Sequence, residues 1–143
     1  MQALCNLAKS YGPVVGRILI SLLFLKSGFE KIAGFSAVAG FMASRGMPAA
    51  ELLLVGAVVL EIAGALMVLL GWHARWGALM LAVFTVPATL IFHNFWAVDA
   101  AQYSNQVNHF MKNLAILGGL AYVMGAGSGP FSLRKDGESG NPH

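Results

Sequence analysis

The chain has 143 residues and a formal net charge of +3; 57% of its residues are hydrophobic and 10% are charged. A soluble domain carries about 25% charged residues, so this chain has too few charges to cover a surface in contact with water. Together with a mean hydropathy of +0.70, this composition excludes an ordinary soluble domain. It predicts an all-α, polytopic membrane protein with a single domain.

Four apolar stretches follow one another along the chain. A helix rises 1.5 Å per residue, so about 20 residues cross a hydrocarbon core of ~30 Å. Membrane strands would instead show strict alternation over about 10 residues, and this pattern is absent from the sequence. The predicted spanning helices are 13–34, 50–70, 74–97 and 107–126. We therefore expect a bundle of four transmembrane helices.

The first connection between these helices has a pattern of its own. Phe35, Val38, Phe41 and Met42 recur at helical spacing, which predicts a short amphipathic helix lying at the membrane surface. The other connections are expected to be irregular. They are a short turn at 71–75, a polar loop at 99–106 and, after the domain at 1–133, a short polar tail at 134–143.

Lysine and arginine residues predict the orientation of the chain in the membrane. Lys9, Arg75, Arg134 and Lys135 fall on the side that holds both termini, and Lys31 and Arg45 fall on the other. Because cytoplasmic loops carry the excess of positive charge, we expect both termini to be cytoplasmic. For a bacterial inner membrane, the first loop and the 99–106 loop would then face outward.

Polar residues from several predicted helices converge near this outer end. Up-and-down connectivity places the ends of the first and third helices beside the starts of the second and fourth. The residues brought together are Lys26, Glu30, His93, Asn94, His109, Lys112 and Asn113, with Glu61 deeper in the bundle and Arg17 as a second buried charge.

Energetics predict that these charged groups pair with one another. A charged side chain at the centre of a spanning helix costs about 2.5–3.5 kcal/mol on insertion scales, so such groups are expected to face inward. The expected partners of Glu30 and Glu61 are Lys26, Lys112 and Arg17. Lys31, near a helix end, is expected instead to extend to the membrane interface.

Two interpretations of this cluster are open. Hydrogen bonds between membrane helices contribute about 0.6 kcal/mol each, and the cluster could serve only to join helices. For Glu61 and Arg17, this structural role and a functional role are equally supported. For the four polar residues that flank the last connection, we favour a role facing a ligand in an apolar bundle. These four are His93, His109, Lys112 and Asn113.

Several segments, taken in order, resemble the DoxX family of small inner-membrane proteins. They are "GRILISLLFLKSGFEKIAGF", "LLVGAVVLEIAGALMVLLGWHARWGAL", "FHNFW", "HFMKNLAILGG" and "GPFSL". The resemblance implies a four-helix membrane domain that acts as an oxidoreductase or as a redox-associated subunit, with links to thiosulfate or quinol oxidation and to electrophile and oxidative stress. Family positions are matched by Gly28, Lys31, Glu61, Gly64, Phe92, His93, Lys112 and Asn113, whereas Lys26 departs from the pattern.

The residues narrow the redox chemistry that the chain could support. Cys5 is the single cysteine, so intrinsic thiol–disulfide exchange is excluded. No glycine-rich nucleotide motif follows a strand, and His93 and His109 without further ligands argue against haem or another metal. A quinone fits better, because its carbonyl oxygens accept hydrogen bonds from His, Lys and Asn side chains. His93, His109 or Glu30 could carry the protons that its reduction requires.

The sequence therefore favours a quinone-linked or redox-associated subunit of an oxidoreductase system. The alternative is a non-catalytic membrane anchor, assembly factor or small-molecule transporter. The expected partners are the lipid bilayer and either a redox protein or further copies of the chain, with no nucleic acid. The chain carries no electron carrier of its own, so the electrons must come from a partner or from the bound quinone.

Overall fold

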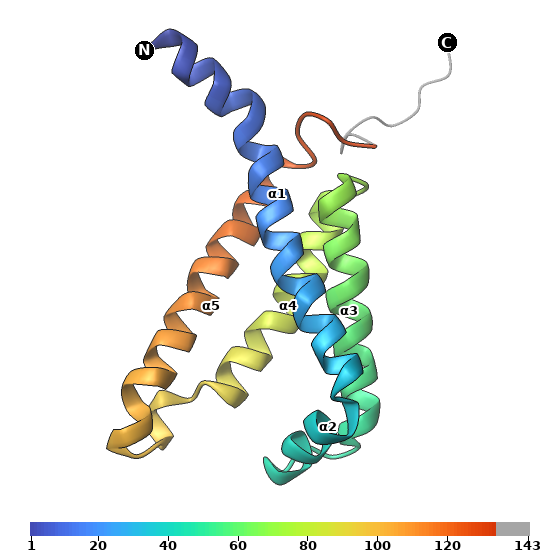
Figure 1. Cartoon of the computed structure of the whole chain (residues 1–143), viewed down its shortest axis with the longest axis vertical. Coiled ribbons are helices and arrows are strands. Elements are labelled where there is room, and N and C mark those ends of the chain that lie inside the picture. The colour runs from blue at the N-terminus through green and yellow to red at the C-terminus, as the bar shows by residue number, and fades with distance from the viewer. Residues whose placement is uncertain (134–143) are drawn as a thin grey trace.

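The computed structural model describes residues 1–133, and the polar tail predicted at 134–143 lies outside the described residues. Within residues 1–133 every regular element is helical. The elements are α1 (Gln2–Ala33), α2 (Phe35–Ser44), α3 (Ala50–Leu70), α4 (Ala74–Phe92), the short 3-10 helix η1 (Phe95–Ala97) and α5 (Ala100–Ala126). Figure 1 shows α1, α3, α4 and α5 running up and down, with α2 at one end. The predicted all-α membrane bundle is confirmed.

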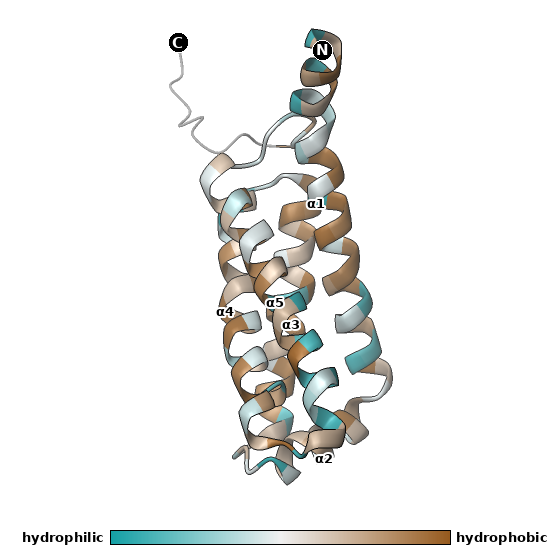
Figure 2. Ribbon diagram, turned by 90° about the vertical axis from the view of Figure 1, so that its left-hand side faces the viewer, coloured by the Kyte–Doolittle hydropathy of each residue, from teal (hydrophilic) through white to brown (hydrophobic). Residues whose placement is uncertain are grey.

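Three helical segments are long and apolar enough to cross a membrane: Gln2–Ala33, Ala50–Leu70 and Ala74–Ala97. The fourth expected span belongs to α5, which has 27 residues but is not among these segments. Its first half is polar. Asn113 Nδ2 donates to Thr89 Oγ1 (2.9 Å), and Thr89 lies one turn before the end of α4. The part of α5 that precedes Asn113 therefore lies in the half of the bundle that contains α2. Figure 2 shows hydrophilic residues of α1 and α5 in this half of the bundle.

Two element boundaries differ from the prediction because of local backbone chemistry. The expected polar loop at 99–106 is wrong, since α5 begins at Ala100. Asp99 is its N-cap, and Asp99 Oδ1 accepts a hydrogen bond from the Gln102 backbone N–H (2.9 Å). This is the usual way in which an aspartate satisfies the first amides of a helix. At the other side of the connection, α4 ends at Phe92 rather than at residue 97.

The first helix also starts earlier than expected. α1 begins at Gln2 and has 32 residues, which corresponds to about 48 Å at 1.5 Å per residue. This length exceeds a ~30 Å hydrocarbon core. The first turns of α1, before Pro13, therefore extend beyond the other helices (Figure 1) and are exposed.

Glycines set how closely the helices approach. A Cβ on Gly64 of α3 would lie 2.9 Å from the Gly77 carbonyl oxygen of α4, and one on Gly77 would lie 2.8 Å from the Gly64 oxygen. A Cβ on Gly28 of α1 would lie 2.8 Å from the Ile62 side chain of α3. Small residues allow such close contact between membrane helices. The contact at Gly28 brings α1 close to Glu61, which neighbours Ile62.

α1 and α5 meet closely at Ile20 and Gly119, where a Cβ on Gly119 would lie 3.1 Å from Ile20 Cδ1. From this point toward α2 the two helices diverge (Figure 1). The larger apolar core, with Val68, Leu81 and Leu120 fully buried, lies around this contact and toward the N-terminus. A smaller apolar cluster lies beneath α2. The bundle is therefore closed at the end that holds the N-terminus, here called the terminal end. It opens between α1 and α5 toward the α2 end.

Candidate ligand-binding site

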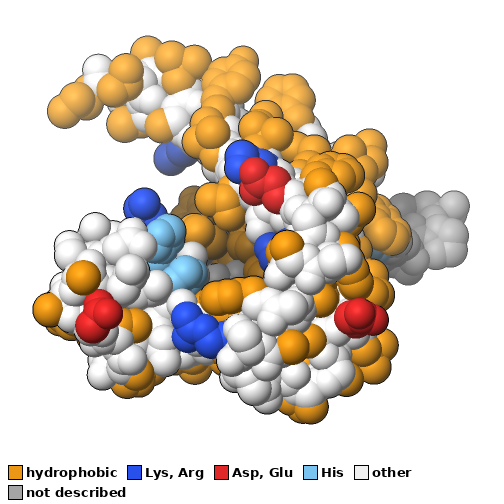
Figure 3. All heavy atoms as spheres, turned by 60° about the horizontal axis from the view of Figure 1, so that its bottom comes forward, with side chains coloured by type: hydrophobic (Ala, Val, Ile, Leu, Met, Phe, Trp, Pro, Cys, Tyr) orange, Lys and Arg blue, Asp and Glu red, His pale blue; other side chains and the backbone are white. Residues whose placement is uncertain are grey.

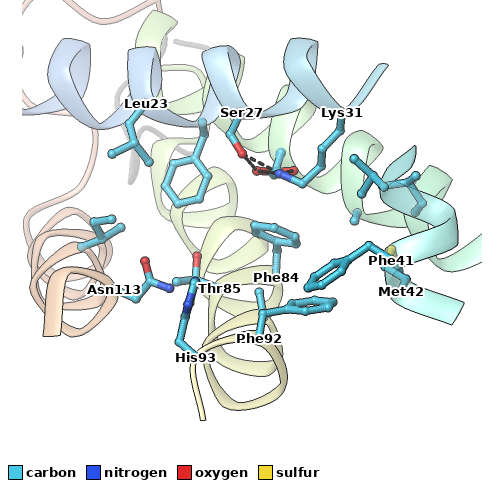
Figure 4. Close-up of a pocket in the computed structure, with 17 residues that line it drawn as sticks. Leu23, Ser27, Lys31, Phe41, Met42, Phe84, Thr85, Phe92, His93 and Asn113 are labelled. Carbon is cyan, nitrogen blue, oxygen red and sulfur yellow. Dashed lines mark hydrogen bonds and ion pairs between the residues drawn. The ribbon is translucent and has the colours of Figure 1, made fainter. Parts of the chain in front are cut away.

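A cavity of about 330 Å³ lies between the helices in the half of the bundle that contains α2. We call it the inner cavity. All five α-helices contribute to its lining, which includes Phe24 and Lys31 of α1, Phe41 of α2, Glu61 of α3, Thr85 and Phe92 of α4 and Asn113 of α5. Among the side chains labelled in Figure 4, Lys31, Phe41, Phe92 and Asn113 point toward a common space from different helices.

One wall of the inner cavity carries a buried ion pair. Glu61 is fully buried, and its Oε2 lies 3.0 Å from Lys31 Nζ. Ser27 Oγ donates to Glu61 Oε1 (2.8 Å), and Lys31 Nζ donates to Ser27 Oγ (2.5 Å). The predicted inward position of Glu61 is confirmed. The expectation that Lys31 extends to the interface is wrong, since its ammonium is the partner of this carboxylate.

The opposite wall carries hydrogen bonds within α4 and one hydrogen bond that joins α5 to α4. Thr85 Oγ1 donates to the Leu81 carbonyl (2.6 Å), and Thr89 Oγ1 donates to the Thr85 carbonyl (2.7 Å). Asn113 then donates to the Thr89 hydroxyl. These bonds fix the amide of Asn113 at the edge of the cavity, where Figure 4 places it beside Thr85 and His93.

The two predicted histidines lie together next to this wall. The rings of His93 and His109 are stacked, with centroids 4.9 Å apart and an interplanar angle of 11°. His93 Nδ1 lies 3.0 Å from Gln106 Oε1. Gln106 was not predicted, because it was assigned to a loop. The helix N-cap at Asp99 is the signal that places Gln106 on the same face of α5 as His109 and Asn113.

Aromatic side chains separate the two polar walls. Lys31 Nζ lies 5.3 Å from the centroid of the Phe84 ring, and the rings of Phe41 and Phe92 are stacked with centroids 5.7 Å apart. Figure 4 shows these three rings beside the open space. The inner cavity therefore has polar groups at two sides and flat apolar groups between them.

A wider cleft of about 650 Å³ adjoins the inner cavity between α1 and α5. We call it the outer cleft. Lys26 and Glu30 line it from α1, and His109 and Lys112 line it from α5. Lys26 Nζ and Glu30 Oε1 are 2.5 Å apart, with side chains that are 72% and 64% exposed. Figure 3 views this end, where histidine and lysine side chains border a hollow with a hydrophobic floor.

The structure thus divides the predicted cluster between two spaces. His93, Asn113 and Glu61 line the inner cavity, whereas Lys26, Glu30, His109 and Lys112 line the outer cleft, with Asn113 common to both. Asn94 lies in the connection between α4 and η1 and lines neither space. That these residues bind a ligand stays a prediction.

Arg17 lies away from the cluster, and the expectation that it pairs with Glu30 or Glu61 is wrong. Its guanidinium donates to the backbone carbonyls of Ser128, Pro130 (3.1 Å) and Phe131 (3.2 Å) at the terminal end. The chain after α5 folds back here, and the Leu133 amide donates to the Leu70 carbonyl (3.0 Å). Arg17 is buried, as predicted, but its contacts are structural.

Comparison with known proteins places this geometry in a family context. The DoxX family model matches residues 12–94, which include Ser27, Lys31, Glu61 and His93. No solved structure shows a significant match to the chain.

Curated relatives cover more of the chain. Inner membrane protein YqjF of Escherichia coli is 36% identical over 122 residues, covering 85% of this chain and 88% of the relative. Inner membrane protein YphA of the same organism is 31% identical over 120 residues, with 84% and 86% covered. ER-derived vesicles protein ERV29 of Saccharomyces cerevisiae is 27% identical over 126 residues, covering 88% of this chain and 34% of the relative.

Proposed function

This chain belongs to the DoxX family of integral membrane proteins, and we propose that it holds a quinone head group in the inner cavity as the quinone-linked subunit of an oxidoreductase system. One observation carries the proposal. Two polar walls, Lys31 with Ser27 and Asn113 with His93, face each other across a gap bordered by aromatic rings (Figure 4).

The chemistry of a quinone matches the two walls. Its flat ring carries carbonyl oxygens on opposite sides, and each accepts hydrogen bonds. An ammonium has three N–H donors and an amide has two. Within residues 1–133 the Lys31 ammonium lies within 3.1 Å of Ser27 Oγ and of both Glu61 carboxylate oxygens, and Asn113 uses one of its two donors. Asn113 therefore keeps one N–H for a ligand oxygen. At the other wall a ligand oxygen shares the Lys31 ammonium with Glu61, and Phe84 supplies an apolar surface for the ring.

The size of the inner cavity supports a head group rather than a whole long-tailed quinone. Ligand pockets usually measure about 300–1,000 Å³, and this cavity, at about 330 Å³, is at the small end of that range. A quinone ring with its substituents is of this size. A long isoprenoid tail would have to lie elsewhere.

Reduction of a quinone to a quinol takes up two electrons and two protons. His93 and the Lys31–Glu61 pair are groups in the lining that can exchange protons. The electrons must come from a partner, because the chain has one cysteine and no readable motif for an electron carrier. We therefore assign the electron donor to a partner redox protein. The family resemblance suggests that this system responds to oxidative or electrophile stress.

The location in the cell is part of the same proposal. The two Escherichia coli relatives are inner membrane proteins, and we place this chain in the inner membrane of a bacterium. The charge distribution puts both termini in the cytoplasm in this proposal, so the half of the bundle that holds the inner cavity lies on the periplasmic side.

The test is the quinone content of protein purified in its native lipid, measured by organic extraction and mass spectrometry. Wild-type protein should carry quinone, and Asn113→Leu and His93→Phe should lose at least 80% of it, because they remove donors with little change in bulk. The matched control is Asn108→Leu, which makes the same change at an exposed position of α5 and should leave the content unchanged.

A wild-type protein that carries no quinone would contradict this function. Full quinone content in both Asn113→Leu and His93→Phe would also contradict it. In either case the non-catalytic anchor, assembly factor or transporter becomes the leading hypothesis.

A further inference from the structure

α1 and α5 run antiparallel, and the residues that line the outer cleft follow in matching steps from their closest contact. Ile20 meets Gly119 at that contact. Counting equal numbers of residues from this contact along the two antiparallel helices puts Leu23 level with Ile116. It then puts Lys26 and Ser27 level with Lys112 and Asn113, and Glu30 level with His109; all of these residues line the cleft. The cleft therefore begins just beyond the Ile20–Gly119 contact and widens toward the α2 end (Figure 1).

The outer cleft and the inner cavity share a boundary. Leu23, Ser27, Asn113 and Ile116 line both spaces. The other sides of the bundle are closed by helix packing, since α1 packs along α3, α3 along α4 and α4 along α5. α2 adds Val38, Phe41 and Met42 to the lining of the inner cavity. The inner cavity thus opens sideways, between α1 and α5.

Polarity changes along this opening. Its deep part is apolar, with Leu23 facing Ile116, and its outer part carries Glu30 and His109. Leu23 lies ten residues before the end of α1 at Ala33, which is about 15 Å along the helix. That distance is half of a ~30 Å hydrocarbon core. The apolar part of the opening therefore lies near the middle of the bilayer.

The helix surfaces that flank the apolar part are suited to contact with lipid. Leu19 and Leu22 of α1 are 62% and 54% exposed, and Met111 of α5 is 57% exposed. An apolar chain in the opening would be continuous with these surfaces. An amphiphile with its head group in the inner cavity and its tail directed toward the bilayer centre has the orientation of a lipid in one leaflet.

We propose that the opening between α1 and α5 is the entrance by which a quinone dissolved in the bilayer reaches the inner cavity, and that its isoprenoid tail stays between Leu23 and Ile116. This inference rests on the proposed function. It narrows the ligand class to quinones with long tails that come from the membrane. It also makes Leu23 and Ile116 determinants of specificity.

The experiment closes the entrance reversibly in protein held in lipid nanodiscs. The variant Leu23→Cys/Ile116→Cys is made in a Cys5→Ser background. A short bifunctional thiol reagent links its two new cysteines, and reduction cleaves the link. Association rates are measured for a benzoquinone with an isoprenoid tail and for the same ring without a tail. We expect linkage to slow the tailed quinone at least tenfold, and reduction to restore its rate. The tailless quinone, which can enter from water through the polar part, should change less than twofold.

The matched control is Ile20→Cys/Gly119→Cys, which links the same two helices on the terminal side of the entrance. This link should change the association rate of neither quinone. An unchanged rate for the tailed quinone in fully linked Leu23→Cys/Ile116→Cys protein would overturn the entrance. Equal slowing of both quinones would also overturn it, because the linkage would then act on the cavity itself. If the protein before linkage binds neither quinone, the proposed function fails and this inference fails with it.

Discussion

The two ends of the bundle use buried polar groups in different ways. At the terminal end, Arg17 lies against carbonyl groups of residues 128–131, and Gly71 leaves room for it, because a Cβ there would collide with its guanidinium. At the α2 end, Lys31, Glu61 and Asn113 stand around a cavity. A charge surrounded by backbone stabilises the fold. Polar groups that surround a volume are what the proposed quinone site requires.

The largest expected effect is the all-or-none labelling of the two ends from outside the cell. Native Cys5 and Ser104 are both exposed, near opposite ends of the bundle. In spheroplasts, a membrane-impermeant maleimide should label Ser104→Cys in a Cys5→Ser background. It should label wild-type Cys5 only after permeabilisation. The reverse pattern would put the inner cavity at the cytoplasmic side.

At the α2 end, Glu61→Leu should have the largest effect on stability. It leaves the Lys31 ammonium without its carboxylate, and breaking a buried pair in this way costs about 3 kcal/mol or more. Thermal unfolding in lipid nanodiscs measures this loss. Glu61→Gln keeps an acceptor and should cost less.

The double variant Glu61→Leu/Lys31→Met distinguishes an effect on stability from an effect on quinone binding. An apolar pair should restore most of the stability, whereas the double variant should not bind quinone. A single Glu61→Leu variant as stable as wild type would show that the ion pair does not matter to the fold.

At the terminal end, Arg17→Leu should destabilise by about 2 kcal/mol, because carbonyls that accept from a charged donor lose their partner. The stability of Arg17→Lys should lie between those of the wild type and Arg17→Leu, since an ammonium cannot span three carbonyls as a guanidinium does. Thermal unfolding and the rate of proteolysis after α5 measure the effect. Quinone content should not change in Arg17→Leu; a loss equal to that of Asn113→Leu would remove the distinction between the two ends.

The smallest effect is expected at the rim of the outer cleft. The Lys26–Glu30 pair is mostly exposed, and exposed pairs contribute about 0–1 kcal/mol. Lys26→Met should therefore lower stability by less than about 1 kcal/mol, with Lys9→Met, at the exposed start of α1, as control. A loss as large as that of Glu61→Leu would mean that the rim pair is buried in the membrane-embedded protein.

The sequence predicts the helices well where long apolar runs determine them. The same runs are what place α3 and α4 across a bilayer. α2 was predicted because four apolar residues recur at helical spacing. Three of them, Phe35, Val38 and Met42, belong to the apolar cluster beneath α2. The start of α5 was missed because a polar composition was interpreted as a loop. The Asp99 N-cap, with Gln102 three residues later, is the local signal that a helix begins there.

The position of the candidate site and one of its two ion pairs were predicted. Several polar residues converge at the α2 end, and Lys26 pairs with Glu30 as expected, yet the partner of Glu61 is Lys31. The rotation of α1 against α3 decides this pairing, and that rotation is set by the contact of Gly28 with Ile62, which spacing along one helix does not reveal. The partners of Arg17 lie in irregular backbone after α5, where no periodic pattern exists to predict them.

The central claim is that a quinone ring occupies the space between the Lys31 wall and the Asn113 wall. A photoreactive quinone with an isoprenoid tail, activated in native-lipid nanodiscs and followed by peptide mass spectrometry, tests it most directly. We predict labelling within residues 23–31 and 113–116, suppressed by excess unlabelled quinone. Labelling that excess quinone does not suppress, or that falls mainly on lipid-exposed surfaces such as Trp76, would contradict the claim.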